Sequence, residues 1–206
     1  SVLFTKFTTP DEVFGPVSLK GLKEDRYVRV AAGKLPEADL LFADEVFKAS
    51  SAILNTLLRV LNERVYDAGD GTAVRVPLKL ALCASNEWPR AEDGGRELDA
   101  LFDRLLFRAA VTPIRSQAGR SRLLWGADHT PTLTTAITPG EVDLARSQAA
   151  AVPWAADARE ALEQVLRELA REGVTPGDRR QFKAVGAARA YAWLDGADRV
   201  RPEHLE

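Results

Sequence analysis

Two adjacent acids, Asp44 and Glu45, end a short apolar run in the stretch LLFADEVFKAS. A carboxylate at the end of an apolar segment loses part of its hydration, so its placement is costly unless another group uses it. Because neighbouring residues of a strand point in opposite directions, we expect the two acids to have different tasks. One such pair of tasks is holding a magnesium ion and activating a water molecule for attack on a phosphate. A strand end followed by a helix-capping acid would also produce this pattern.

A second polar strand end supports the phosphate hypothesis. The apolar stretch LKLALCAS is followed by Asn86. The neutral amide of Asn86 could hydrogen-bond both a phosphate oxygen and an attacking water without adding charge. Asparagine is also common in ordinary turns, so Asn86 by itself would be a weak indication.

Arginines follow in the same order along the chain. Arg104 lies in the stretch LFDRLLFR, and Arg108 is expected one helical turn later. The guanidinium group stays charged and binds phosphate in a bidentate manner, although surface arginines on an amphipathic helix are common. Arg179 and Arg180 are expected in the first turn of a later helix. Positive charge there opposes the helix dipole, which indicates a purpose other than stability.

The elements that must position these residues change character along the chain. Residues 1–9 and 39–43 are typical of strands, and the second is continuously apolar, as expected for a strand buried on both faces of a parallel sheet. A helix is predicted from Ser50 or Ser51, a hairpin over 63–77, and a strand over 78–85. Residues 9–16 are predicted to form a loop and 17–38 a small insertion hairpin. The stretch 97–111 is predicted to pass from helix to strand and to close at Pro113.

Beyond about residue 114 the strand patterns give way to helices rich in alanine and arginine. The clearest of these helices is predicted over 156–172, with Gly173 as its stop. We therefore predict an α/β fold in two parts: a parallel-sheet core over residues 1–113 and an all-helical lid domain over residues 114–206.

Composition excludes several classes of protein. With 28 basic and 30 acidic residues among 206, the net charge of −2 disfavours nucleic acid and anionic membranes as partners. The single cysteine, Cys83, excludes an internal disulfide framework, and together with the lack of a signal-peptide pattern it favours a cytoplasmic location. His129 and His204 lie outside any zinc-ligand pattern and are expected to be solvated.

Taken together, these motifs resemble the MoxR family of AAA+ ATPases, in its RavA-like branch. The resemblance covers nearly the whole chain and rests on five stretches: LFTKFTTPDEVFGP, GKLPEADLLFADEVFKASSAILNTLLRVLNER, ASNEWP, LFDRLLFR and DRRQFKA. It implies a partial AAA+ P-loop-type core followed by a helical lid. The family chemistry is ATP hydrolysis with Mg²⁺, in a ring that is typically a hexamer. The hydrolysis drives chaperone-like remodelling or maturation of partner complexes, often with a von Willebrand A domain protein.

The resemblance also assigns roles to the residues above. Asp44 would be the Walker B acid associated with magnesium, Glu45 the catalytic acid and Asn86 the sensor 1 residue. The arginine finger that reaches the neighbouring subunit's ATP would be Arg104, with Arg108 as the alternative. Sensor 2 would be Arg179, with Arg180 as the alternative.

One departure from the family is large. The sequence contains no Gly-x-x-x-x-Gly-Lys-Ser/Thr phosphate loop and no methionine. Because that loop supplies the amides that cradle the phosphates, we expect this chain alone to be inactive, and we expect the loop to precede it in the intact protein. Two alternatives are a non-hydrolysing AAA-like scaffold without its own phosphate loop, and a DNA-dependent motor. The second would require a basic stripe that binds DNA in a salt-sensitive manner.

Overall fold

The computed structural model describes residues 1–68, 71–87, 91–126 and 133–205, with the backbone alone for 91–97. The chain divides into two compact units, Ser1–Leu105, here called the α/β unit, and Leu106–Glu206, here called the helical unit. The predicted domain boundary at 113/114 stays a prediction.

Three short parallel strands form the central sheet among the described residues of the α/β unit. Their order is β1 (Val2–Leu3), β2 (Leu40–Asp44) and β5 (Leu80–Cys83), with β2 in the middle. The antiparallel pair β3 (Val65–Asp67) and β4 (Ala73–Arg75) is the hairpin predicted before β5. The helical segments of this unit are α1 (Pro10–Phe14), α2 (Leu19–Lys23), η1 (Leu35–Glu37), η2 (Val46–Lys48), α3 (Ser51–Glu63) and α4 (Ala91–Arg104).

The core of this unit lies between one face of the sheet and α3. Leu41 and Ala43 of β2 form one buried cluster with Ile53, Leu54 and Leu57 of α3. The helix presents these residues at the spacing predicted for an amphipathic helix. Because alternate residues of a strand face opposite sides, the other face of β2 is not covered in the same way. Leu40 is 67 % exposed and Phe42 is 45 % exposed, so the prediction that this strand is buried on both faces was wrong.

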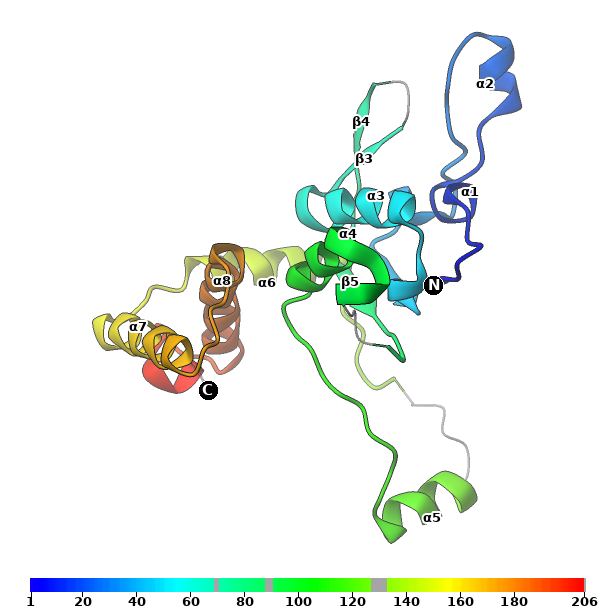
Figure 1. Ribbon diagram of the computed structural model, residues 1–206. Helices are drawn as coiled ribbons and strands as arrows, with labels where there is room; N and C mark the ends of the chain where they lie inside the picture. Colours follow the sequence, from blue (N-terminus) through cyan, green and yellow to red (C-terminus); the bar gives the residue numbers. More distant parts are fainter. Residues whose placement is uncertain (69–70, 88–90, 127–132, 206) are drawn as a thin grey trace. The chain divides into compact units, whose positions relative to one another are not determined.

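Two segments of the α/β unit also differ from the sequence prediction. Residues 10–14 form helix α1, with Pro10 in its first turn and a capping box between Thr9 and Glu12, where a loop was predicted. The predicted insertion hairpin is closed by a single bridge between Val17 and Arg29 and contains helix α2, which projects from the unit (Figure 1).

The stretch after α4 carries no strand. The helix ends at Arg104, and the described residues 105–115 have no regular secondary structure, with Phe107 84 % and Val111 95 % exposed. A strand is stable only when a neighbouring strand satisfies its backbone groups, and none of the described strands pairs with this stretch. The predicted passage from helix to apolar strand was therefore wrong for these residues.

The helical unit consists of α5 (Gln117–Trp125), α6 (Pro139–Ala151), α7 (Ala156–Arg171), α8 (Asp178–Leu194) and the short η3 (Pro202–Leu205). A small core of Val152, Ala158, Ala188, Ala192 and Val200 joins α7 and α8 to the segments that follow α6 and precede η3. Gly173 follows α7 with a φ of 77°, as expected for the predicted helix stop. None of the described helices is both long and apolar enough to span a lipid bilayer.

One histidine prediction was wrong. His204 is only 4 % exposed, its Nδ1 accepts a hydrogen bond of 2.9 Å from the Arg201 amide, and its ring packs edge-on against Tyr191. The burial of His204 could not be predicted from the sequence, because η3 packs against α8, and Tyr191 lies 13 residues before His204 in the chain. His129 lies outside the described residues.

Candidate active site

Parallel pairing of β2 with β5 brings the predicted acids and Asn86 to one edge of the sheet. The register pairs Ala43 with Cys83, and the ladder continues where the Ala84 amide donates to Ala43 O over 2.8 Å. Both strands therefore end at the same edge, which is where ligands bind in α/β sheets. Asn86 Nδ2 donates to Glu45 Oε1 over 2.6 Å, so two residues 41 positions apart form a direct contact.

The backbone at Glu45 turns sharply away from the strand. Glu45 has φ 53° and ψ 38°, the left-handed conformation, which is uncommon for residues other than glycine and often marks functional sites. Its amide donates to Asp44 Oδ1 over 3.0 Å, which stabilises the turn. The 3₁₀ helix η2 begins directly afterwards, with the Lys48 amide donating to Glu45 O over 2.8 Å. The two carboxylates are thus separated by this turn as well as by the strand alternation.

The carboxylate of Glu45 is also next to a cation. Lys48 Nζ lies 3.3 Å from Glu45 Oε2, and the Glu45 side chain is 12 % exposed. No described residue donates a hydrogen bond to this buried Oε2, so the contact with Lys48 is an ion pair without hydrogen-bond alignment. Burial alone would raise the pKa of Glu45, but Lys48 and the hydrogen bonds from Asn86 outweigh it, and the pKa is lowered. Glu45 is therefore an ionised acceptor whose two oxygens contact Asn86 and Lys48.

Asp44 has the chemistry of a shared magnesium ligand. It is partly buried, and Oδ1 is engaged with the Glu45 amide. The described residues contain no cluster of three or more His, Cys, Asp or Glu side chains suited to a metal ion. Mg²⁺ is commonly held by one or two carboxylates together with waters and the phosphates of a bound nucleotide. A single aspartate at this edge fits that mode and would not form an all-protein metal cage.

Of the two candidate finger arginines, only Arg104 lies on a helix. It is the last residue of α4, partly buried, and its Nη1 donates to Ala100 O over 2.8 Å. Arg108 lies in the exposed stretch after the helix, so its predicted place one helical turn later was wrong. The physical reason is that the helix ends near Leu105, whose amide bonds to Phe102 O in a tight last turn.

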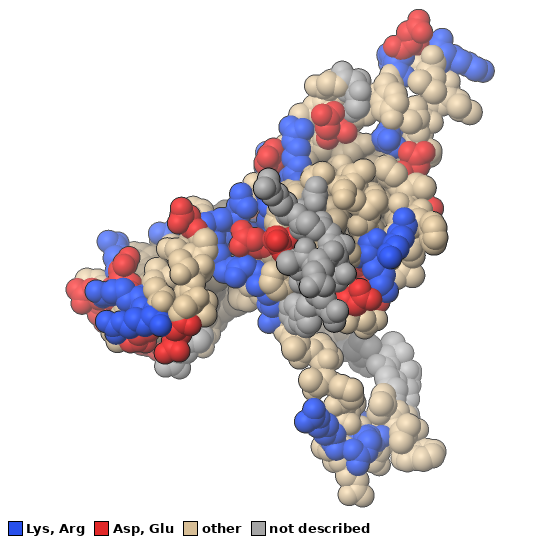
Figure 2. All heavy atoms as spheres, in the orientation of Figure 1, with Lys and Arg blue, Asp and Glu red and all other residues tan. Residues whose placement is uncertain are grey.

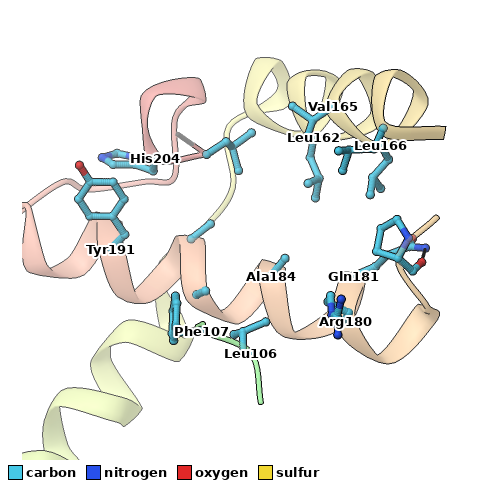
Figure 3. Close-up of a pocket in the computed structure, with 15 residues that line it drawn as sticks. Leu106, Phe107, Leu162, Val165, Leu166, Arg180, Gln181, Ala184, Tyr191 and His204 are labelled. Atoms are coloured by element: carbon cyan, nitrogen blue, oxygen red, sulfur yellow. Dashed lines mark hydrogen bonds between the residues drawn. The ribbon is translucent and has the colours of Figure 1, made fainter. Parts of the chain in front are cut away.

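The two sensor 2 candidates begin α8 in the helical unit. Arg179 is exposed, whereas Arg180 is partly buried and lines an apolar groove of about 450 Å³ between α7 and α8 (Figure 3). Leu162, Val165 and Leu166 of α7 form the opposite wall of this groove. The two neighbouring arginines therefore have different surroundings, which their sequence does not indicate.

The sequence and the fold of this chain are similar to those of known proteins. A family model described as the MoxR domain in the MoxR-vWA-beta-propeller ternary systems matches residues 1–143. The chain belongs to the MoxR family of AAA+ ATPases. The matched range includes Asp44, Glu45, Asn86 and Arg104, while Arg179 lies beyond it. The more specific prediction of the RavA-like branch stays a prediction.

Two further relatives are similar to nearly the whole chain. The uncharacterised proteins MJ0812 and MJ0079 of Methanocaldococcus jannaschii are each 40 % identical to it and match 99 % of it, and the matches cover 53 % and 52 % of their own lengths. The chain thus spans about half the length of these relatives. The structural protein ORF618 of Acidianus two-tailed virus is 27 % identical over 153 residues, which is 70 % of the chain and 24 % of that protein.

A solved structure confirms the predicted fold class. The crystal structure of a presumed ATPase from Cytophaga hutchinsonii superimposes with a TM-score of 0.74 over 99 % of this chain and 65 % of its own, at 17 % identity. The MoxR chain accordingly has an α/β core with a helical region.

One residue of the site was missed in the sequence. Lys48 was not singled out, although it lies three residues after Glu45, a spacing that one turn of 3₁₀ helix brings onto the same side.

Proposed function

We propose that the intact protein hydrolyses ATP, with Glu45 as the residue that activates the attacking water. The main support for this proposal is the 2.6 Å contact between Asn86 and Glu45, directly beside Asp44 at the carboxyl edge of the sheet. The ionised carboxylate of Glu45 would accept a proton from the water. The Asn86 amide would orient the same water and a phosphate oxygen.

Asp44 would hold Mg²⁺, which, when bound, neutralises the charge of the phosphates and polarises the transferred phosphoryl group. The phosphate loop that completes such a site is absent from these 206 residues. The activity is therefore proposed for the full-length protein, and this chain alone is expected to be inactive.

We further propose that the protein assembles into a ring, most simply a hexamer. Arg104 on α4 would act as the finger on the ATP of the neighbouring subunit, and Arg179, or its neighbour Arg180, would sense the nucleotide from the helical unit. The matching family occurs in systems with von Willebrand A and β-propeller proteins, which supports a von Willebrand A partner and a role in remodelling or maturation of complexes. The cytoplasmic location expected from the single cysteine stays a proposal.

Mixed-charge surfaces favour protein over nucleic acid as the partner. Basic and acidic side chains are interspersed over much of the face in Figure 2, whereas α5 carries Arg120 and Arg122 without an acid. Binding of DNA that weakens steeply as salt rises would support the motor alternative instead.

The decisive experiment uses two variants of the full-length protein. Glu45→Gln keeps the shape of the side chain and removes its basicity, so phosphate release should stop while ATP binding persists. Arg104→Ala should also be inactive, because each site would lack its neighbour's arginine. Mixing the two variants should restore part of the activity, since a site with intact Glu45 can then face an intact Arg104.

The outcomes separate the alternatives. Unchanged hydrolysis by Glu45→Gln would refute the assignment of Glu45. Inactive wild-type protein that still assembles would support the non-hydrolysing scaffold. Two inactive variants that never complement each other in mixtures would refute the finger role of Arg104 across subunits.

A further inference from the structure

Lys48 is the one cation that the structure records in an ion pair with Glu45 among the described residues. The left-handed turn at Glu45 and the 3₁₀ helix that follows fold the chain back, so that Lys48 Nζ lies 3.3 Å from Glu45 Oε2. The Lys48 side chain remains 37 % exposed, whereas that of Glu45 is 12 % exposed. The lysine therefore reaches from the surface toward an acid that is mostly covered.

Glu45 is held at both oxygens, from two different elements. Asn86, after β5, donates to Oε1, and Lys48, at the end of η2, pairs with Oε2. A glutamate side chain has three rotatable bonds and several accessible rotamers, and a single contact would leave the second oxygen free to swing. Contacts at both oxygens fix the plane of the carboxylate.

The contact at Oε2 holds an oxygen that is itself buried. Lys48 lies within ion-pair distance but out of hydrogen-bond alignment, and no other described residue donates a hydrogen bond to Oε2. The attraction of the ammonium group therefore keeps the carboxylate from rotating away.

We propose that Lys48 is a positioning residue for hydrolysis, which together with Asn86 holds the Glu45 carboxylate in the orientation needed for proton transfer from the attacking water. This inference rests on the proposed ATPase function and adds a residue to it. Lys48 acts through Glu45 and has no contact of its own with the nucleotide in this role. Small errors in the placement of a reacting group cost on the order of a hundredfold in rate.

The test compares three substitutions in the full-length protein. Lys48→Met keeps the length and removes the charge, and we expect kcat for ATP to fall by roughly ten- to a hundredfold with little change in KM. Lys48→Arg keeps the charge and should recover most of the loss. Arg59→Met is the matched control, because it removes ion pairs of similar length, 3.2 Å to Glu63 and 3.7 Å to Asp67, from an exposed face of α3. That control should leave turnover unchanged, since exposed ion pairs contribute little.

A double variant separates positioning from a structural role. If Lys48 acts only through Glu45, adding Lys48→Met to Glu45→Gln should cause no further loss of residual turnover or of ATP binding. An equal loss in both backgrounds would overturn the proposal. If Lys48→Met does not fold, as judged by its melting temperature, Lys48→Gln replaces it with the same expectations.

The failures of the two proposals are distinguishable. If Glu45→Gln is inactive while folded Lys48→Met turns over at the wild-type rate, the positioning role is refuted and the ATPase assignment stands. If Glu45→Gln hydrolyses ATP normally, the ATPase assignment fails, and the positioning role fails with it.

Discussion

Replacement of Gly15 by alanine should open the α2 loop, because the structure leaves no room for a side chain there. Gly15 has φ 96° and ψ 147°, a region that is nearly exclusive to glycine and costs other residues about 1–3 kcal/mol. A Cβ at this position would lie 2.0 Å from the carbonyl oxygen of Val30. Shifting backbone to relieve such an overlap costs about a further 1–3 kcal/mol. We therefore expect a local destabilisation of about 2–6 kcal/mol for Gly15→Ala.

Gly33→Ala is the matched control. Gly33 also has a positive φ, 71°, but an added Cβ would meet no atom within 4 Å. Only the conformational cost applies there, and it is about 1–2 kcal/mol. The difference between the two variants therefore isolates the overlap with Val30.

Hydrogen exchange followed residue by residue is the suitable assay, because it reports local opening where global unfolding of two units would not. The loop is closed by two backbone bonds, from the Ser18 amide to Val28 O at 2.7 Å and from the Val30 amide to Pro16 O at 2.8 Å. Protection of these two amides should fall roughly five- to 140-fold further in Gly15→Ala than in Gly33→Ala, because the overlap adds about 1–3 kcal/mol and each 1.4 kcal/mol corresponds to a factor of ten. Equal loss of protection in the two variants would refute the reasoning.

Two further expectations concern a thiol and a helix cap. Burial raises the pKa of Cys83 to about 11, so the native protein should react slowly with thiol reagents at pH 8. The free energy of unfolding should also decline as pH rises from about 8.5, where the thiol of the unfolded chain ionises, toward 11. Labelling of the native protein as fast as that of a denatured sample would contradict this. Thr138→Ala should destabilise α6 by about 1 kcal/mol, because the Thr138 hydroxyl accepts from the Glu141 amide at 3.2 Å in a capping box. Ser147→Ala, within the same helix, should be nearly neutral, because the Ser147 hydroxyl bonds back to Asp143 O. Equal melting temperatures of the two variants would show that the Thr138 cap does not stabilise α6. Hydrogen bonds from the Thr138 amide and hydroxyl also lower the pKa of Glu141, so the stabilisation should be lost as pH falls through the lowered pKa.

The sequence by itself determined the features that depend on local order. Helix α3 and helix α7 follow from apolar residues at helical spacing, and the pairing of β3 with β4 follows from two short strand patterns on either side of a Gly/Asp stretch. The succession of Asp44, Glu45, Asn86 and Arg104 was sufficient to indicate the MoxR family, which the family comparison confirms. These properties are visible in a sequence because each depends on residues within a few positions, or on their order alone.

Tertiary structure decided which of these residues meet and which surfaces are covered. The contact between Asn86 and Glu45 exists because β5 pairs with β2 in one register, and a shift of one residue would turn Asn86 away. Lys48 reaches Glu45 because the backbone at Glu45 adopts a left-handed conformation that its residue type does not favour. Leu40 and Phe42 are apolar like Leu41, yet they stay exposed, because α3 covers one face of the sheet. Burial and pairing depend on neighbours distant in the chain, and hydrophobicity alone does not specify those neighbours.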